Sequence, residues 1–203
     1  MKIGITGATG FIGSNLLDKL SKSKRDKITI LTQKEPNRAI QKLKKTMSNS
    51  KAKISIKKVK LSNKENIEKE FRESGFDLIY HVAGLRGISV KKLTEYIEAN
   101  TSPTKILSEL CLKYNVNLVY ISSVGVHGTI PHKLPCTEDS PFVPDCNYHY
   151  SKILAEKQIF AKLNDGLNAI ILRPTITYGS FDYGFLYKII KLVDLHLRLF
   201  SQN

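Results

Sequence analysis

The sequence predicts an α/β fold in which helices cover both faces of a doubly wound parallel sheet. Three observations support this prediction. Short β-branched runs alternate with longer segments of helical periodicity, a glycine-rich turn follows the first run, and a long loop containing several prolines follows the fifth. Parallel strands need a crossover connection, which is usually a helix, and right-handed crossovers place helices on both faces of the sheet.

The elements are expected in strict alternation. Six runs rich in Ile, Val, Leu and Thr are the expected strands, at residues 2–6, 27–32, 54–59, 77–82, 117–122 and 168–173. Five amphipathic segments are the expected helices, at residues 11–21, 37–47, 63–73, 102–114 and 148–163. The proline-containing stretch 125–147 leaves the carboxyl end of a strand, where ligands bind in open α/β sheets.

Composition indicates a globular chain with an excess of lysine. The 203 residues are 41% hydrophobic and 25% charged, with a net charge of +14. Such a charge raises the question of a nucleic-acid or anionic-membrane partner. Aromatic side chains are scarce among the lysines between residues 34 and 69, so no base-stacking platform is expected. We interpret the charge as a solvated lysine-rich surface and expect neither nucleic acid nor membrane as a partner.

Cysteine usage and the first residues favour a cytoplasmic protein. Cys111, Cys136 and Cys146 are odd in number and lack metal-type spacing, so we expect reduced thiols and no metal site. The glycine-rich turn lies where the apolar segment of a signal peptide would be. The late apolar stretch 185–200 is too short and too charged to span a bilayer.

The glycine-rich turn predicts a dinucleotide site. Gly7, Gly10 and Gly13 recur at three-residue spacing between the first expected strand and the first expected helix. Glycines let the chain turn tightly and remove the Cβ atoms that would hold a phosphate away from the backbone. The N–H groups and the positive dipole end of the following helix then face the pyrophosphate.

A second signal is a tyrosine and a lysine four residues apart, Tyr148 and Lys152. Residues at this spacing share one face of a helix. A free tyrosine titrates near ~10, and a neighbouring ammonium lowers that pKa by stabilising the phenolate. The pair therefore makes a usable acid/base. Ser122 and Ser123 end the fifth strand, where a hydroxyl can share a proton with a substrate oxygen near that tyrosine.

Further motifs occur in a fixed order along nearly the whole chain. They are Thr6-Gly7-x-x-Gly10-x-x-Gly13, His81-Val82-Ala83-Gly84, Tyr96-Ile97-Glu98-Ala99-Asn100, Ser122-Ser123-Val124-Gly125-Val126-His127-Gly128, Tyr148-x-x-x-Lys152, Leu172-Arg173-Pro174 and Tyr178-Gly179. Together they resemble the NAD-dependent epimerase/dehydratase family of the extended short-chain dehydrogenase/reductase superfamily. Aligned on Gly128, the family's catalytic serine falls on Ser123 rather than Ser122.

This resemblance implies a Rossmann-like fold and a set of functional residues. The implied catalytic residues are Ser123, Tyr148 and Lys152. The implied cofactor-binding residues are Gly7, Gly10, Phe11, Ile12 and Gly13 at the pyrophosphate, Ala83 near the adenosine, Asn100, and Tyr148 with Lys152 toward the nicotinamide ribose. The implied reaction transfers a hydride between a sugar carbon of a nucleotide sugar and the nicotinamide. Helix pairing through residues 148–163 makes a homodimer possible.

The chain departs from the family pattern where the cofactor and the substrate are chosen. The second strand ends at Thr32 without the aspartate that binds a ribose 2′-hydroxyl in NAD-preferring members. Lys34 and Arg38 can instead meet a 2′-phosphate, so the cofactor is NAD or NADP with a slight tilt to NADP. Ile176 stands where nucleotide-sugar enzymes often have asparagine.

The length of the chain leaves three functional interpretations. We expect residues 1–180 to form the dinucleotide-binding domain and residues 181–203 to be an amphipathic helical remnant of a truncated substrate lobe. The first interpretation is a sugar-nucleotide epimerase or dehydratase. The second is a carbonyl reductase acting on a small ketone. The third is a catalytically impaired remnant that binds the cofactor without turnover.

Overall fold

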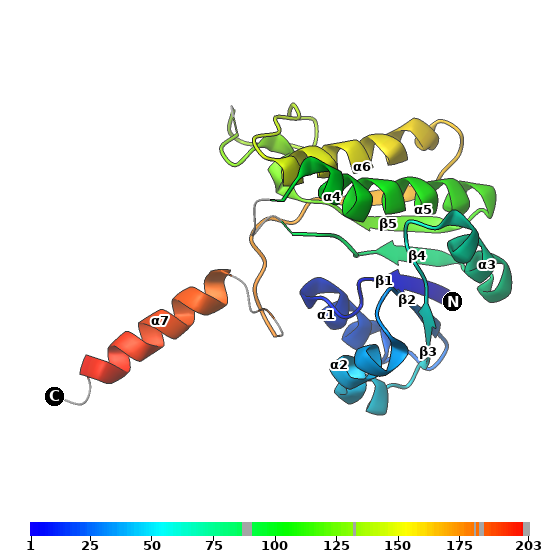
Figure 1. Cartoon of the computed structure of the whole chain (residues 1–203), viewed down its shortest axis with the longest axis horizontal. Helices are drawn as coiled ribbons and strands as arrows, with labels where there is room; N and C mark the ends of the chain where they lie inside the picture. Colours follow the sequence, from blue (N-terminus) through cyan, green and yellow to red (C-terminus); the bar gives the residue numbers. More distant parts are fainter. Residues whose placement is uncertain (87–90, 132, 181, 183–184, 201–203) are drawn as a thin grey trace.

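A computed structural model describes residues 1–86, 91–131, 133–180, 182 and 185–200, and is built around a six-stranded sheet (Figure 1). The strands are β1 (Lys2–Thr6), β2 (Lys27–Thr32), β3 (Lys53–Lys58), β4 (Leu78–His81), β5 (Asn117–Ile121) and β6 (Ala169–Leu172). Their order is β3-β2-β1-β4-β5-β6, and all five pairings are parallel. Strands β2 and β3 are added on one side of β1, and strands β4, β5 and β6 are added on the other side. This order confirms the predicted doubly wound fold.

The helical segments match the predicted ones and add three short ones. They are α1 (Phe11–Leu20), α2 (Pro36–Ser48), α3 (Lys64–Ser74), α4 (Leu93–Tyr96), the π-helical η1 (Ile97–Thr101), α5 (Ser102–Lys113), the 3₁₀-helical η2 (Val124–His127), α6 (Asn147–Leu163) and α7 (Phe185–Phe200). We predicted a helix start at Ser102. Pro103 favours a first turn there, but the chain is already helical from Leu93 through α4 and η1.

Two apolar cores lie on opposite faces of the sheet. Against α1 and α2 the core includes Ile5, Leu17, Ile30 and Leu43. Against α3, α5 and α6 it is larger and includes Phe71, Ile79, Leu107, Leu118, Tyr120 and Ile159. Strands covered on both faces read as continuous apolar runs, which is the pattern that predicted them. The cores fix the carboxyl ends of β1, β4, β5 and β6, and these ends carry the functional loops.

A hydrogen-bonded chain through His81 ties β1, β4 and α5 together. Thr104 Oγ1 donates to the carbonyl of Asn100 at 2.6 Å, so it accepts the Nε2 proton of His81 at 3.0 Å. His81 Nδ1 then accepts from Thr6 Oγ1 at 2.7 Å, and Thr6 Oγ1 accepts from the Ala83 N–H. Every polar atom of the buried imidazole is bonded in its neutral form, and burial lowers the pKa of His81 to about 3.

Acidification is therefore expected to destabilise the fold through His81. Below pH 6.5 the unfolded chain takes up a proton on this residue while the native protein does not, so stability falls with pH until about pH 3. At pH 5 the cost of this group alone is ~2 kcal/mol relative to pH 7. Urea denaturation at both values should show a smaller pH dependence in His81→Gln than in the unchanged protein. An equal pH dependence in the two proteins would contradict this account.

Helix α7 projects away from the sheet at the end of the chain (Figure 1). Its exposed apolar side chains include Ile190, Leu192 and Val193. Within the described part of the chain, no helix is both long enough and apolar enough to span a membrane. The division at residue 180 between a cofactor domain and a helical remnant stays a prediction.

Candidate cofactor and substrate site

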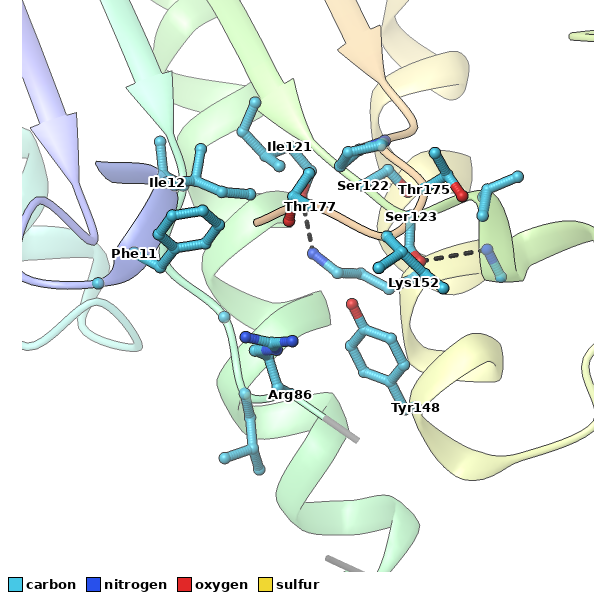
Figure 2. A pocket seen from close by; sticks show the side chains of 18 of the residues that line it. Phe11, Ile12, Arg86, Ile121, Ser122, Ser123, Tyr148, Lys152, Thr175 and Thr177 are labelled. Carbon is cyan, nitrogen blue, oxygen red and sulfur yellow. Dashed lines mark hydrogen bonds between the residues drawn. The ribbon is translucent and has the colours of Figure 1, made fainter. Parts of the chain in front are cut away.

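A cavity of about 630 Å³ opens where the carboxyl ends of β1, β4, β5 and β6 meet (Figure 2). The glycine-rich turn forms one end, and the end of β5 with the start of α6 forms the other. The loop after β4 and the segment after β6 form the sides. Among the lining residues are Gly7, Gly10, Phe11, Ile12, Gly13, Ser123, Tyr148 and Lys152. One cavity thus brings together the predicted pyrophosphate loop and all three predicted catalytic side chains.

The glycine-rich turn is packed too tightly for side chains. Gly7 has a φ of +73°, and a Cβ there would lie 2.5 Å from the Ala83 nitrogen. A Cβ on Gly13 would lie 2.1 Å from the Gly7 carbonyl oxygen. The turn closes with a hydrogen bond from the Gly10 N–H to that same carbonyl at 2.9 Å. The spacing predicted from sequence thus has two separate causes, a left-handed conformation at Gly7 and close backbone packing at Gly13.

Helix α1 begins at the cavity in a form suited to an anion. Its N-cap is Gly10, whose lack of a side chain leaves the first turn without a side-chain hydrogen-bond acceptor. The first turn also contains no acidic residue. Free N–H groups and the helix dipole favour a phosphate group at this position.

Tyr148 and Ser123 form the centre of the opposite end. Figure 2 shows the Tyr148 side chain pointing into the cavity between Arg86 and Lys152. Burial raises the pKa of Tyr148, while a hydrogen bond with Ser123 and the positive charge of Arg86 act in the lowering direction. Ser123 Oγ in turn accepts the Gly125 N–H at 3.1 Å, which fixes the hydroxyl at the start of η2. The phenol and the serine hydroxyl therefore face one another across the cavity floor.

Lys152 is held against the end of β5, on the side toward which the Tyr148 hydroxyl points (Figure 2). Its Nζ donates to the Ile121 carbonyl at 2.8 Å and to the Tyr120 hydroxyl at 3.1 Å. The ammonium also lies 4.7 Å from the centre of the Tyr120 ring. Burial lowers the pKa of Lys152 to about 8, against the opposing effect of the Glu156 carboxylate. Lys152 is thus a buried cation in a fixed position, one helical turn from Tyr148.

The two serines at the end of β5 have different surroundings. Ser122 is buried, and its Oγ donates to Glu156 Oε1 at 2.5 Å. The Arg173 guanidinium pairs with the same carboxylate, at 2.8 Å from Oε2. Ser122 is therefore bonded within the protein, whereas Ser123 contacts Tyr148. The assignment of the family's catalytic serine to Ser123 stays a prediction.

Three predicted cofactor residues lie outside the cavity lining. The buried Asn100 uses its amide on the backbone of Leu85, at 2.7 and 3.2 Å, and on Ser151 Oγ at 3.0 Å. It therefore positions the loop after β4. Ala83 lies behind Gly7, and Lys34 is exposed beyond the end of β2. Their contacts with a cofactor stay predictions, and the side chain of Arg38 lies outside the described residues.

Sequence reasoning missed three ionisable lining residues, Arg86, Asp182 and His149. Arg86 Nη1 lies 3.9 Å from Asp182 Oδ1, which links the loop after β4 to the segment after β6. His149 pairs with Asp145 at 2.5 Å. The cavity is therefore lined by more ionisable side chains than the sequence motifs indicated. The position of Arg86 two residues after the His81-to-Gly84 motif was the available sequence signal.

The sheet order and the glycine-rich turn (the glycine cradle of Gly7, Gly10 and Gly13) are those of a Rossmann-type dinucleotide-binding domain. Their combination in one cavity with Ser123, Tyr148 and Lys152 is typical of the dehydrogenase/reductase class. Residues 3–195 match the model of the NAD dependent epimerase/dehydratase family, so the chain belongs to that family.

Curated relatives similar to this chain include UDP-glucose 4-epimerases. UDP-glucose 4-epimerase 4 of Oryza sativa subsp. japonica is 31% identical over 189 residues, which are 90% of this chain and 51% of the relative. UDP-glucose 4-epimerase of Caenorhabditis elegans is 32% identical, over 92% of this chain and 57% of its own length. The chain thus spans about half the length of the curated relatives it matches.

Among solved structures, Pal from Bacillus thuringiensis superposes with a TM-score of 0.79 at 27% identity, over 93% of this chain and 62% of its own. The UDP-Glc/GlcNAc 4-epimerase of Campylobacter jejuni gives a TM-score of 0.73 at 26% identity, over 85% and 52% of the two chains. The dTDP-glucose 4,6-dehydratase of Bacillus anthracis, in complex with NAD, gives a TM-score of 0.75 at 25% identity. The match covers 90% of this chain and 57% of the dehydratase.

Proposed function

We propose that this chain carries the cofactor site and the acid/base group of a nicotinamide-dependent epimerase or dehydratase acting on a nucleotide sugar. The observation that carries the proposal is the single cavity that joins the glycine cradle to Ser123, Tyr148 and Lys152. The glycine-rich turn would hold the pyrophosphate of a bound dinucleotide at one end of this cavity, and Tyr148 lies at the other end.

The residues present fit a dinucleotide. At Gly7 and Gly13 a Cβ would collide with backbone, and at Gly10 the bare N-cap of α1 faces the cavity. These residues, with Phe11 and Ile12, would hold the pyrophosphate. When bound, the nicotinamide supplies reversible hydride transfer. Family membership and the epimerases among the relatives support NAD in this role.

The chain's own residues handle the proton. Tyr148 Oη would take a proton from a sugar hydroxyl and later return it, which is general acid/base work. The fixed charge of Lys152 would favour the phenolate and contact the nicotinamide ribose. The Ser123 hydroxyl, held by the Gly125 N–H, would hydrogen-bond the same substrate oxygen and so set its distance from Tyr148.

The function is tested with the purified chain, NAD⁺ and UDP-galactose. Formation of UDP-glucose, or dehydration of dTDP-glucose with transient absorbance of the reduced nicotinamide, is the expected result. Cofactor binding without turnover of either sugar nucleotide would overturn the proposal in favour of a cofactor-binding remnant. Oxidation of NADPH by a small ketone, with both sugar nucleotides left unchanged, would overturn it in favour of a carbonyl reductase.

We further propose that Lys34 gives the site a slight preference for NADP. It follows the end of β2, where the chain offers Thr32 instead of an aspartate. Lys34→Ala is expected to weaken NADP⁺ binding about fivefold, equivalent to ~1 kcal/mol, and to leave NAD⁺ binding unchanged. Titration calorimetry with NADP⁺ and with NAD⁺ measures both affinities. The preference is wrong if the unchanged protein binds NAD⁺ about tenfold or more tightly than NADP⁺.

A further inference from the structure

Three side chains with metal-binding atoms gather at the N-terminus of α6, and one of them, His149, also lines the cavity. They come from the sequence Asp145-Cys146-x-x-His149, and their ligand atoms all lie within 4.8 Å of one another. Asp145 Oδ1 lies 2.5 Å from His149 Nδ1, and Cys146 Sγ accepts the His149 N–H at 3.5 Å. The group therefore brings one oxygen, one nitrogen and one sulfur close together, and a bound ion would replace the proton that Asp145 and His149 share.

Contacts outside the group hold two of these side chains in place. The Thr129 N–H donates to Asp145 Oδ2 at 2.7 Å, which orients the other oxygen of the carboxylate toward His149. The His149 ring lies against Gly125, where a Cβ would come within 2.2 Å of Nε2. The imidazole therefore occupies space that only a glycine at position 125 leaves open. Cys146 is the N-cap of α6, so its position is set by the start of that helix.

We propose that Asp145, Cys146 and His149 form a binding site for a thiophilic divalent cation of the Zn²⁺ class. Sulfur and imidazole ligands select such ions over Mg²⁺ and Ca²⁺, which prefer oxygen. Three protein ligands leave the fourth position of a tetrahedral ion open. The proposed site departs from our expectation of no metal site. That expectation considered only the spacing between cysteines, whereas the proposed ligands are one cysteine, one aspartate and one histidine.

An ion bound at this site would affect Tyr148 and Ser123, because His149 packs close to both. Tyr148 lies between Cys146 and His149 in the chain, and its ring centre is 5.6 Å from that of His149. On the other side, His149 rests on Gly125, whose N–H fixes the Ser123 hydroxyl. A bound ion is therefore placed to alter Tyr148 and Ser123, and to inhibit the proposed reaction. The binding site itself does not depend on that reaction.

Titration of the full chain with Co²⁺ tests the site independently of catalysis. A thiolate-to-Co²⁺ charge-transfer band should appear at one equivalent and be abolished by added Zn²⁺. Cys146→Ser keeps a good N-cap for α6 but should remove the band and lower Zn²⁺ affinity at least ~10-fold. The matched control is Cys136→Ser, since Cys136 lies in the same loop and outside the group, and it should leave the band unchanged.

A chain that binds Co²⁺ without a thiolate band, or not at all, would overturn the proposal. So would a band that persists in Cys146→Ser or disappears in Cys136→Ser. Urea denaturation without metal distinguishes loss of the site from loss of the fold, because both variants should unfold like the unchanged protein. His149→Gln gives a second test and should also lose the single-equivalent binding.

Discussion

Tyr148→Phe is expected to lower kcat of the proposed epimerase reaction by about 10²–10⁴-fold, the range that a positioned acid/base group contributes. The substitution removes only the hydroxyl that faces Ser123 and leaves the half-buried ring packed 6.0 Å from the ring of Tyr96. Cofactor affinity should therefore change little. Interconversion of UDP-galactose and UDP-glucose gives the rate, and the change in NADH fluorescence on binding gives the cofactor affinity.

Tyr150→Phe is the matched control for this experiment. Tyr150 lies two residues further along α6, is 41% exposed, and is not part of the cavity lining. Loss of its hydroxyl should leave turnover unchanged. Full turnover in Tyr148→Phe would exclude the acid/base role of that residue, and equal losses in both variants would indicate a general effect on α6 instead.

The sheet could be predicted from sequence because its signals are local. The β1 run, the glycine spacing and the α1 pattern are all read within twenty residues, and they match the structure to within one residue. The observed ends of β4 differ by one residue from the predicted ones, although backbone hydrogen bonds to β1 continue beyond the observed strand. Asp77 and Val82 still donate to Lys2 and Thr6 although β4 spans only Leu78–His81.

The site could be predicted only in part, because loops bring residues together through contacts that sequence does not display. Ser123, Tyr148 and Lys152 lie at element ends, so their convergence follows from the predicted topology. Arg86 and Asp182 come from loops after β4 and β6, and nothing in the local pattern aligns them. Asn100 illustrates the reverse case. Its motif places it beside the cofactor, yet its amide is bonded to Leu85 and Ser151.

The second large effect is expected from Gly13→Ala. A methyl group at this position would meet the Gly7 carbonyl oxygen at 2.1 Å, and neither a Cβ nor a backbone carbonyl can rotate away as the end of a flexible side chain can. The turn and α1 must separate, which should cost about 2–3 kcal/mol of the free energy of unfolding. The same displacement moves the first turn of α1 away from the pyrophosphate. Cofactor affinity should fall about 100-fold or more, equivalent to ~2.8 kcal/mol.

Gly10→Ala separates these two effects. Its Cβ would lie 3.3 Å from the same carbonyl oxygen, a tight contact that a small shift relieves. Because Gly10 faces the cavity as the N-cap of α1, its methyl group obstructs the anion rather than the fold. We therefore expect Gly10→Ala to unfold in urea nearly like the unchanged protein and still to bind NAD⁺ and NADP⁺ weakly. If both variants kept full cofactor affinity, the glycine cradle would not be the pyrophosphate site, and the cofactor would have to bind elsewhere in the cavity.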